Sequence, residues 1–284
     1  MSHAGPAIPE PTIDEHLPAW PGWMCRRRPD FLIIGAQKSG TTSLLNYLRH
    51  HPSVAVPRTK ELKYFDVQWS HGVRWYARHF PLHPTAAWRA RRGHGPVLVG
   101  EKSPSYLFYP AAPARAHALL PHARLIALLR DPVDRAVSHY QHNHRRKRES
   151  LSFEDALDRE REHLGAEFAR HAVGGGCSDT RLMHWSYLAR GRYAEQLERW
   201  YGRFPRTHVL VLRAEDLFRE PGATFERVQE FLGLSRWMPG KFDTYNPSGG
   251  YDPISRETRA RLWDYFAPHN ERLRALVGPD MRWD

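Results

Sequence analysis

The chain has 284 residues, 41% of them hydrophobic and 26% charged, which is enough for one substantial core and typical of a globular protein. Its formal charge of +11 favours anionic partners, such as nucleotides, sulfated sugars, nucleic acid or a membrane surface, without choosing among them. No run of 18 apolar residues is present, so no membrane-spanning helix is predicted.

The N-terminus is rich in proline and lacks the apolar stretch of a signal peptide, so we expect a cytoplasmic location. Two cysteines, Cys25 and Cys177, are too few for a disulfide framework. A single bridge between them is the alternative, but in a reducing compartment we expect both to be unpaired thiols.

Residues 1–29 carry many prolines and an arginine triplet at 26–28, and we interpret them as an N-terminal arm. A single domain is expected over residues 30–284. It begins with the apolar run F-L-I-I at 31–34, which ends at Gly35 and predicts a buried strand. Leucines at 44, 45 and 48 then share one helical face, and Pro52 ends that helix.

The turn between this strand and this helix, G-A-Q-K-S-G-T-T at 35–42, predicts a phosphate-binding loop. Its small residues let backbone N–H groups turn towards an anion, and the following helix adds its positive dipole end. The spacing from Gly35 to Gly40 matches nucleotide triphosphatases, but Thr41 replaces their lysine and Lys38 lies inside the loop. The loop therefore lacks most of the metal apparatus of ATP hydrolysis. An ordinary strand-to-helix turn is the alternative interpretation.

Three further apolar runs predict strands, at 97–99, 125–129 and 209–212. Side chains that recur at helical spacing are interpreted as core-facing helix surfaces: Tyr193, Leu197, Trp200, Tyr201 and Phe204, then Phe225, Val228, Phe231 and Leu232. Strands that alternate with helices predict an α/β fold, with a central parallel sheet flanked by helices on both faces.

A second candidate anion site follows the run at 125–129. Pro132 fits the first turn of a helix, so Arg130 stands at the carboxyl end of the strand, where open α/β sheets bind ligands. Ser138 follows about two helical turns later, and a guanidinium with a hydroxyl suits a terminal phosphate. An Arg130–Asp134 pair that caps the helix is an equal interpretation of these residues alone.

Two motifs together, G-A-Q-K-S-G-T-T-S at 35–43 and L-L-R-D-P-V-D-R-A-V-S-H-Y at 128–140, resemble sulfotransferases that use 3′-phosphoadenosine 5′-phosphosulfate (PAPS). The resemblance is greatest to the heparan sulfate (glucosaminyl) type, and it implies a P-loop-like domain. In that family the second motif binds the 3′-phosphate, here through Arg130 and Ser138. The first motif binds the 5′-phosphosulfate, here through Lys38, Ser39, Gly40, Thr41, Thr42 and Ser43.

Two more segments carry the resemblance. The run K-E-L-K-Y-F-D at 60–66 resembles the segment with the family's catalytic glutamate, which makes Glu61 the candidate general base. The run E-K-S-P-S-Y at 101–106 places Lys102 towards the sulfuryl oxygens, and Lys38 is the candidate for stabilising the leaving phosphate. No metal is needed, because lysines and amides neutralise the charge. Without the resemblance, Lys60–Glu61 and Glu101–Lys102 would be surface ion pairs worth about 0–1 kcal/mol each.

The end of the chain, from Tyr245 to Trp283, resembles the family's cofactor loop and closing helix. The loop's usual K-G-R-like triplet is replaced, and we assign its role to Ser248, Gly249, Gly250 and Tyr251. Lys63 stands where 3-O-sulfating members carry histidine, and the family's Golgi anchor and late disulfide are absent. These differences from the family point to a bacterial-type cytosolic enzyme and speak against heparan itself as the acceptor.

Two other functions are alternatives to sulfuryl transfer. A small-molecule or nucleotide kinase requires Mg²⁺ and ATP, and the missing lysine after Gly40 speaks against it. A non-catalytic nucleic-acid binder suits the positive charge, but no recognised motif supports it. The acceptor (sugar, lipid headgroup, phenol or natural product), the choice between hydroxyl and amine, and the oligomeric state are left open by the sequence.

Histidines at 139, 142 and 144 precede the basic run R-R-K-R at 145–148. Their spacing matches no metal-ligand pattern, and we interpret the whole segment as a solvated basic helix end. A rim that attracts an anionic substrate is the second interpretation.

Overall fold

A computed structural model describes residues 25–82, 97–172, 182, 184–243 and 254–283. Its centre is a five-stranded sheet in the order β2-β3-β1-β4-β5, and all neighbouring strands are parallel. The predicted strands are all present, and β2 is an addition of only two residues. The strand bounds are β1 Phe31–Gly35, β2 Val54–Ala55, β3 Leu98–Lys102, β4 Arg124–Leu129 and β5 Val209–Arg213.

The helices confirm the predicted helical patterns. The longer ones are α1 (Thr41–His50), α2 (Gly72–Ala77), α4 (Ala112–Leu119), α5 (Pro132–Arg145), α6 (Phe153–Ala172), α8 (Tyr193–Tyr201), α9 (Ala214–Arg219), α10 (Pro221–Leu232) and α11 (Arg256–Val277). Short 3₁₀ turns are η1 (Trp69–His71), η3 (Ala189–Gly191) and η4 (Arg206–His208). Pro132 opens α5 as expected, and Phe204 packs in the core just beyond the end of α8.

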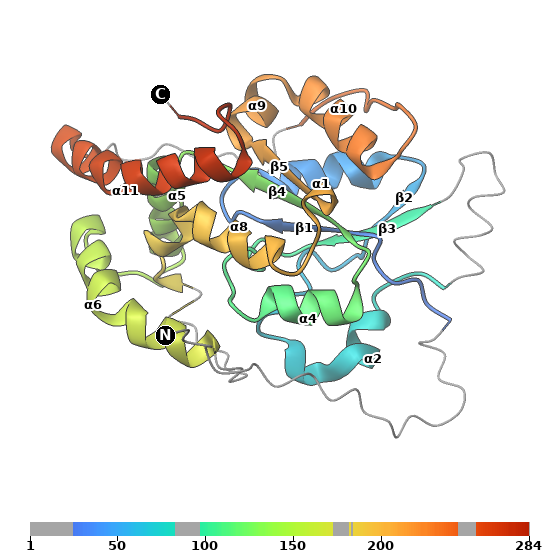
Figure 1. Ribbon diagram of the computed structural model, residues 1–284, viewed down its shortest axis with the longest axis horizontal. Helices are drawn as coiled ribbons and strands as arrows, with labels where there is room; N and C mark the ends of the chain where they lie inside the picture. The colour runs from blue at the N-terminus through green and yellow to red at the C-terminus, as the bar shows by residue number, and fades with distance from the viewer. Residues whose placement is uncertain (1–24, 83–96, 173–181, 183, 244–253, 284) are drawn as a thin grey trace, which may run out of the picture.

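Alternate residues of each strand point to opposite faces of the sheet, and helices cover both faces. In β1, Leu32 and Ile34 join a core that includes side chains of α2, α4 and α8. Phe31 and Ile33 instead join a second core with side chains of α1, α9 and α10. The same division of helices is visible in Figure 1. The structure thus confirms a single parallel sheet flanked by helices on both faces.

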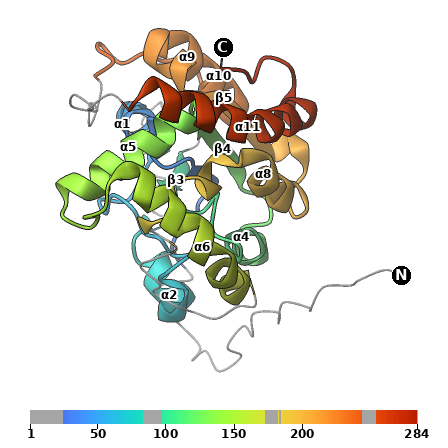
Figure 2. The same cartoon turned by 90° about the vertical axis from the view of Figure 1, so that its left-hand side faces the viewer.

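A third apolar cluster joins α5, α6 and α11, which lie together at the end of the sheet where β4 leads into α5. Figure 2 shows these three helices stacked over one another. The cluster includes Val133 on α5, Leu157 on α6 and Phe266 on α11, all fully buried. It fixes α5, and therefore the candidate second anion site, against the body of the domain.

The strand order determines which loops meet. β1 is paired on one side with β3, where Ile33 is opposite Lys102, and on the other side with β4. The loop that follows β1 is therefore flanked by the end of β3 and the end of β4. Carboxyl ends of parallel strands lie at one edge, so this arrangement gathers the three predicted segments there.

The predicted arm falls mostly outside the described residues. Its last part is tied to the body, because Arg26 forms an antiparallel bridge with Leu82. Cys25 is exposed and unpaired, and Cys177 lies outside the described residues. Within the part of the chain that the structure describes, none of the helices combines the length and the apolar character needed to cross a bilayer, and the cytoplasmic location stays a prediction.

Candidate active site

The phosphate loop connects the end of β1 at Gly35 to the start of α1 at Thr41. Two of its residues are left-handed, Lys38 with φ 72° and Gly40 with φ 80°. At Gly40 a Cβ atom would lie 2.8 Å from Cε1 of Phe218, a residue of α9. Both the backbone angle and this contact therefore require glycine at position 40.

The loop fits an anionic phosphate or sulfate group. The hydroxyl of Ser39 is fully buried and has no hydrogen-bond partner, so the loop holds an unused donor. The N-cap of α1, Gly40, supplies no side-chain cap, and the first turn of α1 has no acidic residue. This helix end therefore carries no acidic group that would repel an anion, and the helix dipole favours an anion there.

Lys102 joins three predicted segments at one point. Its ammonium donates to Oε1 of Glu61 at 2.9 Å and to the hydroxyl of Thr42 at 3.1 Å. The Lys102 side chain is 1% exposed, while that of Glu61 is 29% exposed. Burial lowers the pKa of Lys102, and the attraction of Glu61 opposes this. The cation is thus enclosed beside the phosphate loop, and the carboxylate is open to an incoming group.

The alternative of two surface pairs, Lys60–Glu61 and Glu101–Lys102, does not describe the structure. Lys102 is buried and pairs with Glu61. Glu101, its neighbour on β3, is 1% exposed and accepts three hydrogen bonds. The donors are the hydroxyls of Tyr76 at 3.0 Å, Ser103 at 3.0 Å and Tyr106 at 2.8 Å. Burial raises the pKa of Glu101 to about 7 in spite of these donors.

The segment around Glu61 is anchored a few residues later by Asp66. This carboxylate is buried, accepts from the Ser105 hydroxyl, and accepts from the Val67 amide at 2.6 Å. Burial raises its pKa to about 6. Arg115 of α4 donates to the carbonyls of Phe65 and Asp66 at 3.1 and 2.8 Å. The segment at 61–66 is therefore held by Lys102 at the end of β3, by Ser105 in the turn that follows and by Arg115 of α4.

Arg130 lies directly after β4 and reaches the phosphate loop, where its Nη1 is 3.4 Å from the carbonyl of Lys38. The N-cap of α5 is the side chain of Asp131, which accepts from the Asp134 amide at 2.8 Å. Arg130 is 3.9 Å from Asp134, whose closer partner is Arg259 at 3.0 Å. Capping is therefore done by Asp131 rather than by an Arg130–Asp134 pair. Ser138 lies further along α5 and is fully buried.

The histidine segment is only partly a solvated helix end. The residues at 144–148 are exposed, as expected. His139, however, is fully buried against the ring of Tyr187, and burial lowers its pKa well below the ordinary value. The prediction was wrong for His139, because this side of α5 is covered by Tyr187 and excluded from solvent. Among the described residues, no group of three or more His, Cys, Asp or Glu could hold a metal.

The residues assigned to the cofactor loop, Ser248, Gly249, Gly250 and Tyr251, lie outside the described residues.

Sequence reasoning gave Glu101, Ser103 and Tyr106 no role of their own. The signal that could have found Glu101 is strand alternation. The strand was predicted only at 97–99, but β3 continues to Lys102 and sends Glu101 and Lys102 to opposite sides.

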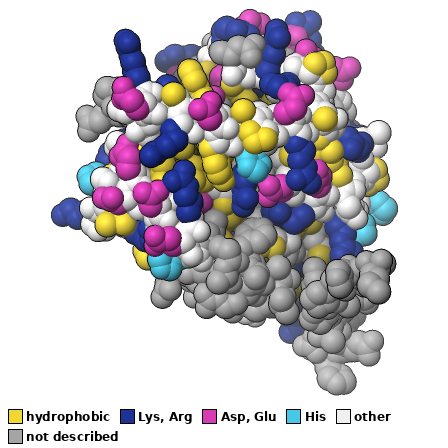
Figure 3. Space-filling view, turned by 60° about the vertical axis from the view of Figure 1, so that its left-hand side comes forward, with side chains coloured by type: hydrophobic (Ala, Val, Ile, Leu, Met, Phe, Trp, Pro, Cys, Tyr) yellow, Lys and Arg dark blue, Asp and Glu magenta, His cyan; other side chains and the backbone are white. Residues whose placement is uncertain are grey.

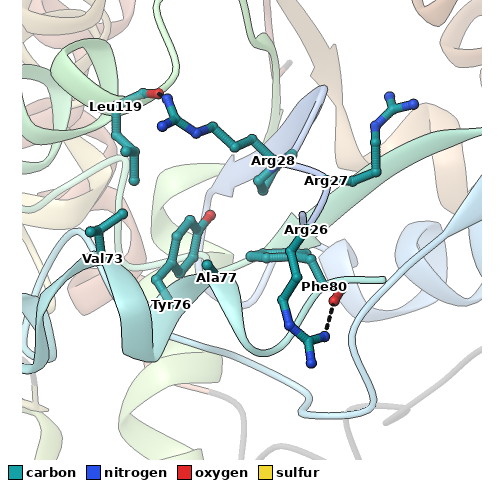
Figure 4. A pocket seen from close by; sticks show the side chains of 9 residues that line it. Arg26, Arg27, Arg28, Val73, Tyr76, Ala77, Phe80 and Leu119 are labelled. Carbon is teal, nitrogen blue, oxygen red and sulfur yellow. Dashed lines mark hydrogen bonds between the residues drawn. The ribbon is translucent and has the colours of Figure 1, made fainter. Parts of the chain in front are cut away.

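A small cavity lies at the other end of β1, before Phe31, and has Val73, Tyr76 and Phe80 in its lining. Figure 4 shows that the neighbouring arginines do not converge on it: Arg28 extends to the Leu119 carbonyl, and Arg26 donates to the Phe80 carbonyl at 2.6 Å. On the face in Figure 3, Lys and Arg are interspersed with Asp and Glu rather than gathered in one patch. Neither feature competes with the site at the carboxyl edge.

Comparison with known proteins gives consistent results. Residues 28–245 match the family described as sulfotransferase domain. The chain is 32% identical to human heparan sulfate glucosamine 3-O-sulfotransferase 6, over 96% of this chain and 81% of that enzyme. It is 31% identical to mouse heparan sulfate glucosamine 3-O-sulfotransferase 3B1, over 91% of this chain and 66% of that enzyme's length.

Among solved structures, a sulfotransferase from Alicyclobacillus acidocaldarius is similar in fold, with a TM-score of 0.65 and 32% sequence identity. The match covers 88% of this chain and 96% of that protein.

Proposed function

The chain belongs to the sulfotransferase family, and from this premise we propose that it transfers the sulfuryl group of PAPS to an acceptor hydroxyl, or to an amine, with Glu61 as general base. The observation that carries the proposal is the position of Lys102. One buried ammonium contacts both the candidate base and Thr42 at the start of the phosphate-loop helix. A base and a cation so placed are what sulfuryl transfer beside a bound phosphate requires.

The donor is assigned to the two anion sites. The loop amides, Lys38, and the hydroxyls at positions 39 and 41–43 would hold the 5′-phosphosulfate. Arg130 and Ser138 would hold the 3′-phosphate. The 3.4 Å contact of Arg130 with the carbonyl of Lys38 supports this division, because Arg130 lies beside the loop that we propose to hold the 5′-phosphosulfate. Ser248 to Tyr251 complete the assignment as a proposal from the sequence.

In the reaction, the acceptor oxygen forms a bond to sulfur while the bond between sulfur and the 5′-phosphate oxygen breaks. Glu61 takes the proton of the acceptor hydroxyl. General-base catalysis of this kind typically raises the rate by about 10²–10⁴-fold. The electron pair of the broken bond stays on the leaving phosphate, where Lys38 stabilises the charge. Lys102 stabilises the sulfuryl oxygens during transfer, and its burial strengthens this effect because its charge is only weakly screened by water.

We propose a sugar hydroxyl as acceptor, since the relatives named above act on the glucosamine of heparan sulfate. Lys63 lies at the rim of the site, with its ammonium 4.0 Å from Oε2 of Glu61 and 40% of its side chain exposed. A cation at this place favours a sugar that carries a carboxylate or sulfate near the reacting hydroxyl. Because 3-O-sulfating members of the family carry histidine at the position of Lys63, heparan sulfate itself is only one of several acceptors to test.

The first experiment is calorimetric titration with 3′-phosphoadenosine 5′-phosphate (PAP), in parallel with ATP and Mg²⁺. We expect metal-independent PAP binding that weakens about 10–100-fold in Arg130→Ala, as loss of a hydrogen bond to a charged group implies. Arg124→Ala is the matched control, because Arg124 lies at the opposite end of the same strand and is exposed. It should bind PAP like the wild type.

Transfer is then followed with ³⁵S-labelled PAPS on a panel of heparan sulfate, desulfated heparan sulfate, chondroitin and p-nitrophenol. Label in a glycan supports the proposed acceptor class, and label only in the phenol contradicts it. Binding of ATP and Mg²⁺ without binding of PAP would overturn the proposal and favour the kinase.

A further inference from the structure

Glu101 is a buried carboxylate that the proposed reaction does not use. It lies on β3 between Gly100 and Lys102, and 1% of it is exposed. Its Oε1 accepts from Tyr76 and Tyr106, and its Oε2 accepts from Ser103. A carboxylate buried with three hydroxyl donors is costly to desolvate, which calls for a reason beyond filling the core.

Two of the three hydroxyls reach the segment that carries Glu61. The Ser103 hydroxyl accepts from the Lys63 amide at 2.9 Å, and the Tyr106 hydroxyl accepts from the Tyr64 amide at 2.8 Å. Each hydroxyl thus has its proton directed to Glu101 and its lone pair directed to a backbone amide. The third donor, Tyr76, instead stacks its ring on that of Tyr64, with 4.4 Å between the ring centroids.

The backbone held in this way has an unusual conformation. Lys63 has φ 52°, a left-handed angle that is uncommon for residues other than glycine. The hydrogen bond from its amide to Ser103, and the one from the next amide to Tyr106, oppose relaxation to an extended chain. Glu61 lies two residues earlier, so the same bonds set where its carboxylate meets Lys102.

We propose that Glu101 is a positioning residue that holds Glu61 against Lys102 through the hydroxyls of Ser103 and Tyr106. The inference rests on the proposed function, in which Glu61 is the base. Because side chains alternate along β3, its two last residues act on opposite sides of the sheet. Lys102 projects to the Thr42 side of the sheet, and Glu101 projects to the side where the backbone at 63–64 is anchored.

The test compares Tyr106→Phe and Ser103→Ala with the matched control Tyr76→Phe. Tyr76 and Tyr106 each donate one bond to Oε1 of Glu101, and phenylalanine preserves the ring packing of both. Of these two tyrosines, only Tyr106 also accepts a hydrogen bond from the backbone amide of Tyr64, in the segment that carries Glu61. We expect kcat to fall about 10-fold or more in Tyr106→Phe and Ser103→Ala, with the KM for PAPS nearly unchanged, because the base is misplaced. Tyr76→Phe should keep the wild-type kcat.

Amide hydrogen exchange gives a readout that needs no substrate. The amides of Lys63 and Tyr64 should exchange faster in Tyr106→Phe and Ser103→Ala, and at the wild-type rate in Tyr76→Phe. Equal effects of Tyr76→Phe and Tyr106→Phe on kcat would overturn the inference, as would faster exchange with wild-type kcat. A wild-type protein that neither binds PAP nor transfers label overturns the proposed function instead, so the two failures are distinguishable.

Discussion

Replacing Lys102 by methionine should separate activity from stability. Methionine keeps the unbranched apolar stem of lysine and removes only the ammonium. That ammonium bonds to Glu61 at 2.9 Å and to Thr42 at 3.1 Å, and its side chain is 1% exposed. The substitution therefore deletes one enclosed positive charge at the proposed reacting centre and leaves the packing nearly unchanged.

The expected loss in kcat is about 10²–10³, or roughly 3–4 kcal/mol, the usual result of removing one charge-stabilising donor from a site that excludes water. Stability should change by less than about 1 kcal/mol or improve. The pKa of Lys102 is lowered by burial, so its charge is held at a cost. Glu61 is not left as an isolated buried charge, since it is 29% exposed and has Lys63 at 4.0 Å.

The assay is ³⁵S transfer from PAPS to the acceptor identified in the panel, with PAP affinity from calorimetry and the free energy of unfolding from urea titration. The control is Arg203→Ala, which removes an exposed cation from the turn that follows α8. It should alter none of the three quantities. A Lys102→Met enzyme with a kcat within about 3-fold of wild type would refute the reasoning, and so would a loss of activity that merely parallels unfolding.

Three more changes have defined outcomes. Glu61→Gln should lower kcat by about 10²–10⁴ with PAP affinity retained, because it removes the base and not the donor site; exposed Glu257→Gln on α11 is its control, and wild-type kcat in Glu61→Gln would exclude the assigned role. Gly40→Ala should destabilise the fold by about 1–2 kcal/mol and weaken PAP binding, because φ is 80° and Phe218 occupies the Cβ position; urea unfolding and calorimetry measure both, and unchanged affinity would contradict the loop assignment. Glu101→Gln should gain stability relative to wild type as pH rises from about 4.5 to 7. The pKa of Glu101 is raised to about 7 from 4.5, so the folded protein holds this proton more tightly and its ionisation opposes folding, by at most about 1.4 kcal/mol per pH unit. A stability difference that is constant from pH 5 to 8 would rule this out.

Much of the architecture follows from short-range pattern. Apolar runs bounded by turns predicted β1, β3, β4 and β5, and strand–helix alternation predicted their parallel sheet. The loop at 35–42 was recognised because glycine and small residues at a strand-to-helix junction leave amides for an anion. Pro132 marked the start of α5, since its fixed φ suits a first helical turn. These features depend on residues within one element, and the sequence alone determines them.

The arrangement of the site depends on contacts between distant segments. Lys102 and Glu61 are 41 residues apart, and their pairing arises because the strand order puts the end of β3 beside the phosphate loop. Local spacing had suggested surface pairs between neighbours, whereas alternation along β3 sends Glu101 and Lys102 to different partners. The sequence likewise predicts a solvated end at His139, whereas the folded chain buries it completely against the ring of Tyr187, a residue 48 positions away. Which charges are buried, and with which partners, is decided by the tertiary structure, because burial and pairing are properties of the packed chain.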